Sequence, residues 1–506
     1  MERRLKNQKE QYRETPDQED MDGDDAGAAS AKGSSNANDR SAAGHRGSTK
    51  APRQKSSQAA AELTDVSREA AERAEQPYAL WSSERVFILS TAAAGVGLGN
   101  LWRFPTLIGE NGGGSFLLVY AVAVVLFAIP FAALEIAVGR DTHGSVIASF
   151  RRLGRYFVPL GIGIVLLTLA INSYYFVISG WTLGYAVEAT MDTAPTFSEF
   201  TTGYASLWWL GATGLLVAAI LAFGLSGIER AAQFLMPLLL LTLLGIAVYA
   251  FRNGATSEAL SFLFSPDPVR LGDPAVWRAA FGQAFFSLTI GQGYLITYGS
   301  YLPLRVNVPR SVASIAAINS GVAILAGLAI FPLVFEAGLD PGAGSELAFE
   351  TLPRAFQQMG GSSILEPVFF WLLFVAALSS CLGGAKVVTA ALREQWRWIG
   401  PVSGVLLGVI AIVVLGIPSA LSYAAPGWTI AGSPVLDSVD RLVGSNGTIL
   451  TAIASSLVLA WRFSPDHIGH QFGLHQRAAN ALSWAVRIAP LGLVTLFCLG
   501  MIAQST

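Results

Sequence analysis

The sequence predicts an all-α membrane protein that crosses the bilayer eleven times, as two inverted five-helix repeats and one extra helix. Three observations predict this fold. Only 13% of the 506 residues are charged and 52% are hydrophobic, whereas soluble domains contain about 25% charged residues. The chain contains eleven apolar runs, most of them near the length that a membrane helix needs. Two of these runs, five crossings apart, are interrupted by glycines.

The amino-terminal segment, residues 1–76, has a different composition. It is a mixture of Glu, Asp, Lys, Arg, Ser, Gly and Ala with almost no large apolar residues. Such a segment buries too little apolar surface to offset its conformational entropy. It also lacks the apolar core of a secretory signal peptide. We therefore expect a disordered tail at 1–76, followed by a membrane domain at 77–506.

The apolar runs define the order of the crossings. They start near Arg85, Ser115, Tyr156, Leu207, Ala231, Trp277, Val312, Ile364, Val402, Asp437 and Trp484. The link after the second run contains Arg140, Arg151, Arg152 and Arg155, and three later links on the same side are also basic. Basic links stay in the cytoplasm. We expect a multi-pass protein of the cell membrane with its tail cytoplasmic and its carboxyl terminus outside.

The first and sixth runs are broken at membrane depth. The first reads "TAAAGVGLGNLWRFP" from Thr91, and the sixth reads "AFFSLTIGQGYLITYGSYLP". Glycines can simply allow close helix packing. An unwound stretch is otherwise tolerated in the membrane only where it lines a cavity, and its free carbonyls and amides can bind a cation and a carboxylate. The odd spacing predicts inverted repeats at about 85–252 and 277–463, with the eleventh helix at about 484–503.

Oxygen-bearing side chains lie in two other runs. Ser379 and Ser380 are adjacent in the eighth run, and Asn319 interrupts the seventh. Serines often bond to their own helix. Hard cations, however, take oxygen ligands, so paired hydroxyls opposite a carbonyl-rich break favour a cation site.

Five motifs together resemble one known family. In order they are "GVGLGNLWRFP", "ENGGGSF", "YYFVISGWTLGY", "GQAFFSLTIGQG" and "INS". They are similar to motifs of the neurotransmitter:sodium symporter family, which includes the bacterial leucine transporter and some prokaryotic amino acid transporters with eleven helices. The resemblance implies a transporter domain that moves a neutral amino acid with sodium by alternating access.

The resemblance also implies two sodium ions. The first site would use Gly95, Asn100, Ser287 and Asn319. The second would use the carbonyls of Ala93, Val96 and Ala376 with the hydroxyls of Ser379 and Ser380.

A substrate site between the two breaks is implied as well. Its carboxylate would bind the Leu98 and Gly99 amides and the Tyr175 hydroxyl, and its amine the carbonyls of Gly95, Phe286 and Ser287 near Thr289. Gly97 stands where monoamine transporters have aspartate, so the substrate should bring its own carboxylate. The side-chain wall would be Ile171, Phe286, Thr289, Gln292 and Gly384. Small Gly384 and polar Gln292 indicate a side chain larger than that of leucine, or partly polar.

Gates are the third implied feature. The outer gate would pair Arg103 with Asp440, above a lid of Tyr175 and Phe286. The inner gate would include Glu394 and Tyr301. Its expected arginine is absent, because Tyr78 occupies that position and Arg73 lies further out.

Chloride dependence stays open. Tyr120, Gln283, Ser287 and Asn319 match the family's chloride pocket, but Ala323 replaces its serine or glutamate. A loosely held chloride and a separate proton route are both possible. By the same resemblance, Glu135 would be a buried structural acid under the break of the first helix.

Other functional classes fit less well. A membrane sensor that binds an amino acid without moving it is the main alternative, but no signalling domain is present. No nucleophile–base arrangement indicates an enzyme, and no basic patch indicates nucleic acid. The sequence does not specify which amino acid is bound, the role of the tail or the oligomeric state.

Overall fold

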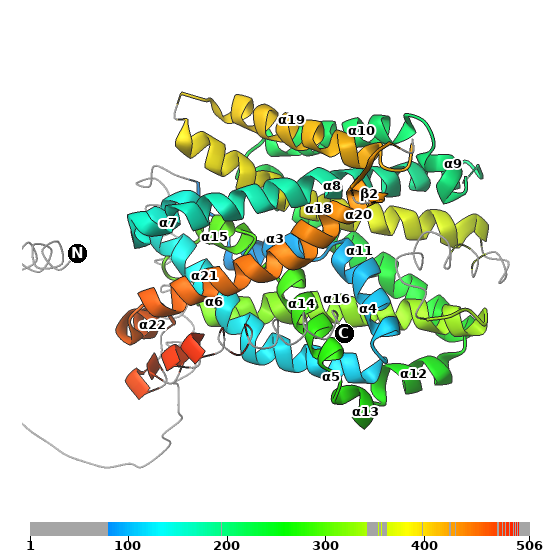
Figure 1. Ribbon diagram of the computed structural model, residues 1–506, viewed down its shortest axis with the longest axis horizontal. Helices are drawn as coiled ribbons and strands as arrows, with labels where there is room; N and C mark the ends of the chain where they lie inside the picture. The colour runs from blue at the N-terminus through cyan, green and yellow to red at the C-terminus, as the bar shows by residue number, and fades with distance from the viewer. Residues whose placement is uncertain are drawn as a thin grey trace, which may run out of the picture. The chain divides into compact units, whose positions relative to one another are not determined.

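The computed structural model describes most of the membrane domain (Figure 1). The described residues are 79–472, with gaps at 194, 342–352, 354–355, 357–361, 397, 425–426 and 431, and scattered residues between 475 and 494. The predicted tail at 1–76, Arg73 and Tyr78, and most of the predicted eleventh helix lie outside them.

Within the described residues, seven helical stretches are long and apolar enough to cross a membrane. They are Gly114–Thr142, Arg155–Thr190, Leu225–Asn253, Val308–Glu336, Ser363–Gln395, Pro401–Ala420 and Val435–Arg462. These stretches match the second, third, fifth, seventh, eighth, ninth and tenth predicted runs. The fourth run forms a shorter apolar helix, α10 (Ala205–Leu221).

The first run is broken as its glycines predict. Helix α3 (Glu84–Gly95) begins at Ser83, whose side chain accepts from the Val86 amide, and ends where Val96 turns to an extended conformation. The chain resumes as a short π-helix, η1 (Gly99–Arg103), and continues as α4 (Phe104–Glu110). The peptide groups around Val96 to Leu98 are therefore not part of a continuous helix.

The sixth run is broken in the same way. Helix α14 (Pro274–Ser287) is capped by Asp273, and α15 (Tyr294–Gly299) resumes after a turn. Thr289, Gly291 and Gly293 all have positive φ in this turn, a conformation that glycine adopts without strain. A Cβ on Gly291 would also overlap the backbone of Ala452, so glycine is required there for two reasons.

The remaining elements complete an almost entirely helical chain. In order they are α5 (Gly114–Ala123), η2 (Val124–Ala128), α6 (Ile129–Thr142), α7 (Val146–Leu153), η3 (Arg155–Phe157), α8 (Val158–Thr190), α9 (Phe197–Thr201), α11 (Leu225–Asn253), α12 (Thr256–Phe264), α13 (Pro268–Leu271), α16 (Val308–Glu336), α18 (Ser362–Gln395), α19 (Pro401–Ala420), β1 (Thr429–Ile430), β2 (Ser433–Pro434), α20 (Val435–Val439), η5 (Asp440–Gly447), α21 (Thr448–Arg462) and α22 (Pro465–Phe472). The two strands form an antiparallel pair.

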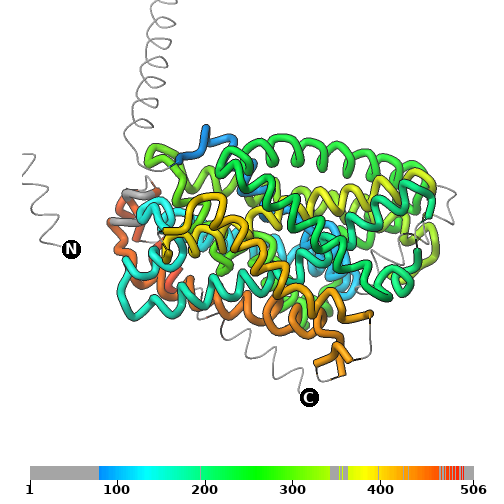
Figure 2. The backbone as a smooth tube through the Cα atoms, turned by 90° about the horizontal axis from the view of Figure 1, so that it is seen from above, coloured from blue at the N-terminus to red at the C-terminus, as the bar shows by residue number. Residues whose placement is uncertain are grey.

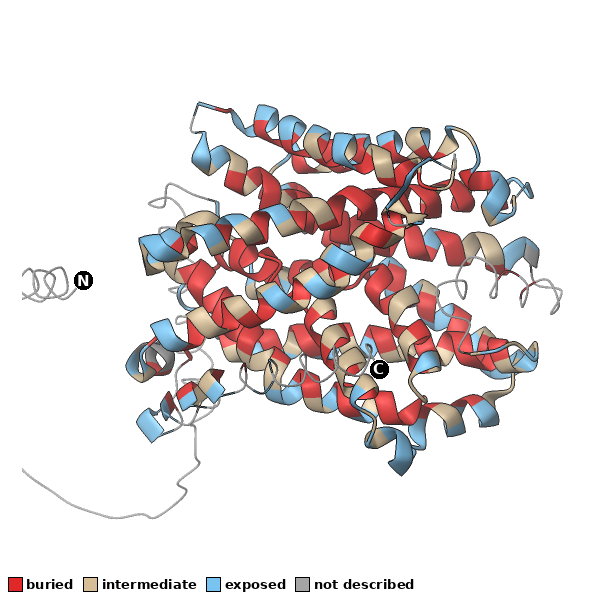
Figure 3. Ribbon diagram, viewed as in Figure 1, coloured by how far each residue is buried: buried red, intermediate tan, exposed pale blue. Residues whose placement is uncertain are grey.

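The buried centre of the bundle contains α8 and α18, which pack along each other (Figures 1 and 2). The most apolar window of α18 is 89% buried, whereas that of α11 is 33% buried. Figure 3 shows the same difference between inner helices and the exposed faces of α10 and α19. Apolar side chains on such outer faces are suited to contact lipid, and α18 is placed to contact a central site.

The basic residues of the first link do not all lie on the surface. Arg151, Arg152 and Arg155 are exposed. Arg140 instead belongs to α6, is 2% exposed, and donates to the Val306 carbonyl at 2.7 Å. Three of the four arginines used to predict the orientation are therefore surface cations.

Candidate functional site

The two helix breaks meet at a small inner cavity. It is lined by Ala94, Gly95, Gly99, Ile171, Tyr175, Phe286, Thr289, Gln292, Tyr294 and Ser380. Seven of the eleven predicted substrate residues are among them. The free space is about 20 Å³, which is room for about one water molecule. The cavity is thus contracted. The side chains that line it have to move before an amino acid can bind.

Two of the remaining predicted residues, Leu98 and Gly97, lie at the cavity's edge. The Leu98 amide donates to the Tyr175 hydroxyl at 2.8 Å. Two of the three groups expected to bind a carboxylate are therefore paired with each other. A Cβ on Gly97 would overlap the Ser380 and Tyr175 hydroxyls, so the backbone can approach these groups only because residue 97 is glycine.

The space expected at Gly384 is occupied. A Cβ on Gly384 would overlap the side chain of Asn172, which projects from α8. Gly384 is not among the residues that line the inner cavity. The expected gain of room for a larger side chain is therefore not present in this conformation, because Asn172 fills it.

The residues predicted for the first sodium site form one buried cluster. Ser287, the eleventh of the predicted substrate residues, belongs to it. Asn100 donates to the carbonyl and side-chain oxygens of Asn319, each at 3.0 Å, and the Asn319 amide donates to the Ser287 carbonyl at 2.9 Å. The Ser287 hydroxyl contacts the side-chain oxygens of both asparagines. A Cβ on Gly95 would lie 2.8 Å from the Ser287 carbonyl oxygen. The side-chain oxygens of Asn100, Ser287 and Asn319 thus lie close together, an arrangement that suits a hard cation.

Four of the five residues predicted for the second sodium site lie close together. The Ser379 hydroxyl oxygen lies 2.7 Å from the Ala93 carbonyl oxygen, 3.2 Å from that of Val96 and 2.8 Å from that of Ala376. One hydroxyl has one proton and donates it to one acceptor at a time. Ser380, the fifth predicted ligand, instead lines the inner cavity.

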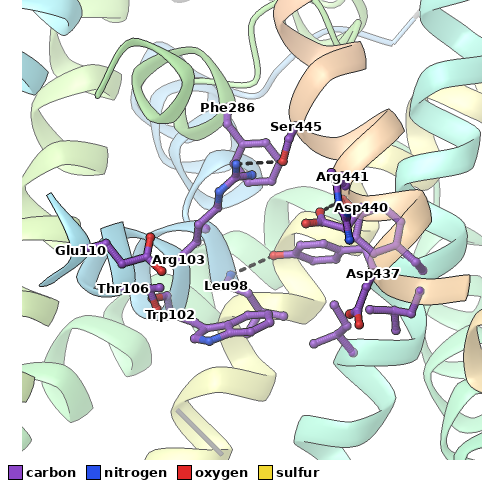
Figure 4. A pocket seen from close by; sticks show the side chains of 15 residues that line it. Leu98, Trp102, Arg103, Thr106, Glu110, Phe286, Asp437, Asp440, Arg441 and Ser445 are labelled. Atoms are coloured by element: carbon purple, nitrogen blue, oxygen red, sulfur yellow. Dashed lines mark hydrogen bonds between the residues drawn. The ribbon is translucent and has the colours of Figure 1, made fainter. Parts of the chain in front are cut away.

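A second cavity, of about 580 Å³, adjoins the inner one; we call it the outer cavity, and Figure 4 shows its lining residues. Gly99, Tyr175 and Phe286 line both cavities, so these residues form the wall between them. Unlike the inner cavity, the outer one is lined by charged side chains, including Arg103 and Asp440.

The two residues of the predicted outer gate have other partners in this conformation. Arg103 donates to the Ser445 hydroxyl at 3.1 Å, and its guanidinium lies 4.7 Å from the centre of the Phe286 ring (Figure 4). Asp440 accepts from the Tyr174 hydroxyl at 2.7 Å. The expected direct pair is thus replaced by separate contacts on the two sides of an open outer cavity.

The inner side contains a cation that our prediction missed. The Lys386 ammonium lies 5.0 Å from the centre of the Tyr301 ring. The Tyr301 carbonyl accepts from the Trp81 amide at 3.0 Å, at the start of the first run. Glu394 accepts from the Ser145 amide at 2.5 Å. A lysine within the eighth apolar run is the sequence signal that could have identified this contact, because charged residues in membrane helices are rare and usually functional.

Glu135 is buried and bonded to the sixth break. One of its carboxylate oxygens accepts from the Gly291 amide at 2.9 Å and from the Ser455 hydroxyl at 2.7 Å. The break in the sixth run frees the Gly291 amide, which then needs an acceptor.

The pocket that resembles a chloride site is only partly paired. The Tyr120 hydroxyl lies 3.2 Å from that of Ser320, and the Gln283 amide nitrogen donates to the Gly99 carbonyl at 2.7 Å. The Gln283 side-chain oxygen is buried without a partner among the described residues, and Ala323 is fully buried in the core.

The chain is similar to known proteins in sequence and in structure. The model of the sodium:neurotransmitter symporter family matches residues 79–206 and 201–506. The chain is 32% identical to an uncharacterized sodium-dependent transporter of Bacillus subtilis, covering 84% of this chain and 98% of that protein. It is 31% identical to one of Haemophilus influenzae, covering 75% and 88% respectively. It is similar to the crystal structure of MhsT in complex with L-phenylalanine, with a TM-score of 0.77, 35% identity and coverage of 84% of this chain and all of that one.

Proposed function

Because the chain belongs to the sodium:neurotransmitter symporter family, whose members here are sodium-dependent membrane transporters, we propose that it carries a neutral amino acid into the cell with sodium. The observation that most supports this proposal is the meeting of two broken helices at one cavity between two clusters of oxygen atoms. Free peptide groups at such breaks bind zwitterions and cations.

Two sodium ions are proposed. The first is bound by Gly95, Asn100, Ser287 and Asn319, with the substrate carboxylate as a further ligand. The second is bound by the carbonyls of Ala93, Val96 and Ala376 and the hydroxyls of Ser379 and Ser380. The convergence of three carbonyl oxygens on Ser379 supports the second site. For Ser380 a small side-chain rotation from the inner cavity is needed.

The substrate is proposed to be an amino acid. Its carboxylate displaces the contact between Leu98 and Tyr175, and its amine binds carbonyls of the two breaks. Gly97 provides no charge, so the carboxylate has to come from the ligand. The L-phenylalanine bound to MhsT, a similar structure, supports this class.

Transport is proposed to occur by alternating access. The open outer cavity supports an outward-facing conformation here. Closure would bring Arg103 and Asp440 together above Tyr175 and Phe286, while the contacts of Tyr301, Lys386 and Trp81 at the inner side open. Each sodium ion that moves inward supplies about 2.3 kcal/mol for each 100 mV of membrane potential.

The architecture proposed for this cycle has eleven crossings of the cell membrane. Repeats at about 85–252 and 277–463 face opposite ways, the eleventh helix is at about 484–503, and the tail at 1–76 is cytoplasmic.

Chloride dependence is a separate question, because Ala323 supplies no charge. Uptake measured with chloride replaced by gluconate, at several pH values, separates chloride from proton coupling.

Uptake into proteoliposomes tests the proposal. With sodium outside and potassium inside, a labelled neutral amino acid should accumulate above equilibrium, and dissipation of the sodium gradient should abolish this accumulation. Sodium-dependent binding without uptake would instead favour a non-transporting sensor. Absence of both would refute the proposed function.

A further inference from the structure

Three polar side chains in the wall of the inner cavity, or directly behind it, are not used by the backbone sites for carboxylate, amine and sodium. They are Gln292 and Tyr294, which line the cavity, and Asn172, which lies behind Tyr294. We call them the polar wall. Asn172 is 1% exposed and Gln292 is 3% exposed. Gln292 and Tyr294 line the cavity directly, and the Asn172 amide lies 3.4 Å from the Tyr294 hydroxyl.

The orientation of the Asn172 amide is fixed by its own helix. Its nitrogen donates to the Thr168 carbonyl at 2.8 Å. A carbonyl oxygen can only accept, so the amide must present its NH₂ group to Thr168. The Asn172 side-chain oxygen therefore faces away from Thr168 and lies beside Gly384, where it is buried without a hydrogen-bond donor among the described residues.

Gln292 has the complementary group. Its backbone carbonyl accepts from the Thr168 hydroxyl at 2.5 Å, so Thr168 connects it to Asn172. The side-chain nitrogen of Gln292 is buried with no acceptor among the described residues. The polar wall thus contains one unpaired acceptor, the Asn172 oxygen, and one unpaired donor, the Gln292 nitrogen. Both residues are hydrogen-bonded to Thr168.

Leaving such groups unpaired is costly. A buried polar group without a partner costs about 1–3 kcal/mol, so a ligand that pairs with both atoms gains affinity over one that pairs with neither. All ten residues that line the inner cavity are uncharged. A charged side chain would therefore lose its hydration without gaining a counter-ion.

We propose that the substrate's side chain ends in a neutral group that both donates and accepts hydrogen bonds, a hydroxyl or a carboxamide. This group donates to the Asn172 oxygen and accepts from the Gln292 amide. The inference rests on the proposed function, because it concerns the side-chain end of the same amino acid site. It makes Asn172, which fills the space beside Gly384, a determinant of specificity.

Three pairs of amino acids of matched shape test this inference: valine with threonine, leucine with asparagine, and phenylalanine with tyrosine. Each is measured as a competitor of sodium-dependent uptake in proteoliposomes. The labelled substrate is the neutral amino acid that accumulates most. We expect the polar member to compete about 10-fold better in at least one pair. Preference for the apolar member in all three pairs would overturn the inference.

Two variants assign the preference to the polar wall. Asn172→Leu and Gln292→Met keep the side-chain volume and remove the polar atoms. Each should reduce the polar-to-apolar ratio about 10-fold. Thr182→Val is the control, because the Thr182 hydroxyl lies on the same helix and donates to its own helix at Ser179. Unchanged ratios in both variants would overturn the assignment.

The proposed function fails separately from this inference. If no amino acid is taken up with sodium, the transporter itself is refuted, and the inference with it. If uptake is sodium-dependent but prefers apolar members, only the inference is refuted. If Asn172→Leu does not fold, the inference is still tested by competition between the amino acid pairs in the wild-type protein and by Gln292→Met.

Discussion

The Ser379 hydroxyl lies 2.7 Å from the carbonyl oxygen of Ala93. This contact joins α18, the most buried of the candidate spans, to the last turn of α3 before the break. The same hydroxyl reaches the Val96 carbonyl beyond the end of α3. A cation in this position would therefore bind the end of α3 and the first residue of the break to α18, and would couple sodium to the conformation of the first run.

Removal of this hydroxyl tests the second sodium site. Ser379→Ala should raise the sodium concentration needed for half-maximal uptake about 10-fold or more, because a ligand oxygen is lost from a buried charge. The measurement is uptake against sodium concentration. Thr389→Val is a matched control on the same helix, since the Thr389 hydroxyl donates to Lys386 of its own helix. If Ser379→Ala and wild type need the same sodium concentration for half-maximal uptake, Ser379 is not a sodium ligand.

Gly97 should tolerate no side chain. A methyl group there would overlap the hydroxyls of Ser380 and Tyr175, both of which lie at the inner cavity. Gly97→Ala should therefore weaken substrate binding by at least about 10-fold, which corresponds to about 1.4 kcal/mol. Binding of labelled substrate to purified protein measures this loss. Gly163→Ala, where no atom lies within 4 Å of the added carbon, should bind as wild type does.

The sequence predicted these breaks better than it predicted what surrounds them. The glycines at 95 and 291 mark the breaks because backbone conformation is a local property, and the structure ends α3 and α14 close to where they predict. The partners across helices are not local. Nothing near Gly384 in the sequence indicates that Asn172 fills its space, because that contact depends on how α8 packs against α18.

The gates illustrate the same limit. Arg103 and Asp440 both line the outer cavity as expected, but the hydroxyls of Ser445 and Tyr174 are their partners here. A sequence pattern describes residues that meet in some state of a transporter, whereas one structure shows a single state. Contacts that change between states are therefore predicted less well than the ligands of a permanent site.

Glu135 should stabilise the sixth break. Its carboxylate accepts from the Gly291 amide and the Ser455 hydroxyl. Glu135→Leu would leave two buried donors unpaired, at a cost of about 1–3 kcal/mol each. We expect a lower melting temperature in detergent and reduced uptake. Glu135→Gln retains a carbonyl oxygen in the same place and should keep most of the stability. Equal melting temperatures for wild type and Glu135→Leu would contradict this role.

Lys386 should stabilise the closed inner side of the transporter. Its ammonium lies over the Tyr301 ring, and Tyr301 in turn holds the Trp81 amide at the start of the first run. A cation over an aromatic ring contributes about 0.5–2 kcal/mol, more where water is excluded. Lys386→Met keeps the length of the side chain and removes the charge. The inner side should then open more readily, which shifts the population away from the outward-facing state.

The readout for Lys386 separates gating from binding. Accessibility of a cysteine introduced near Trp81, labelled from the cytoplasmic side in a background without Cys381 and Cys498, should increase in Lys386→Met. Lys386 does not line the inner cavity, so its loss should not weaken substrate binding directly. The sodium-dependent affinity for substrate should fall only by as much as the outward-facing population falls. Lys386→Arg should restore low accessibility, since guanidinium groups also stack on aromatic rings. If Lys386→Met and Lys386→Arg label equally, the charge does not hold the inner side closed, and the contact with Tyr301 is only one of packing.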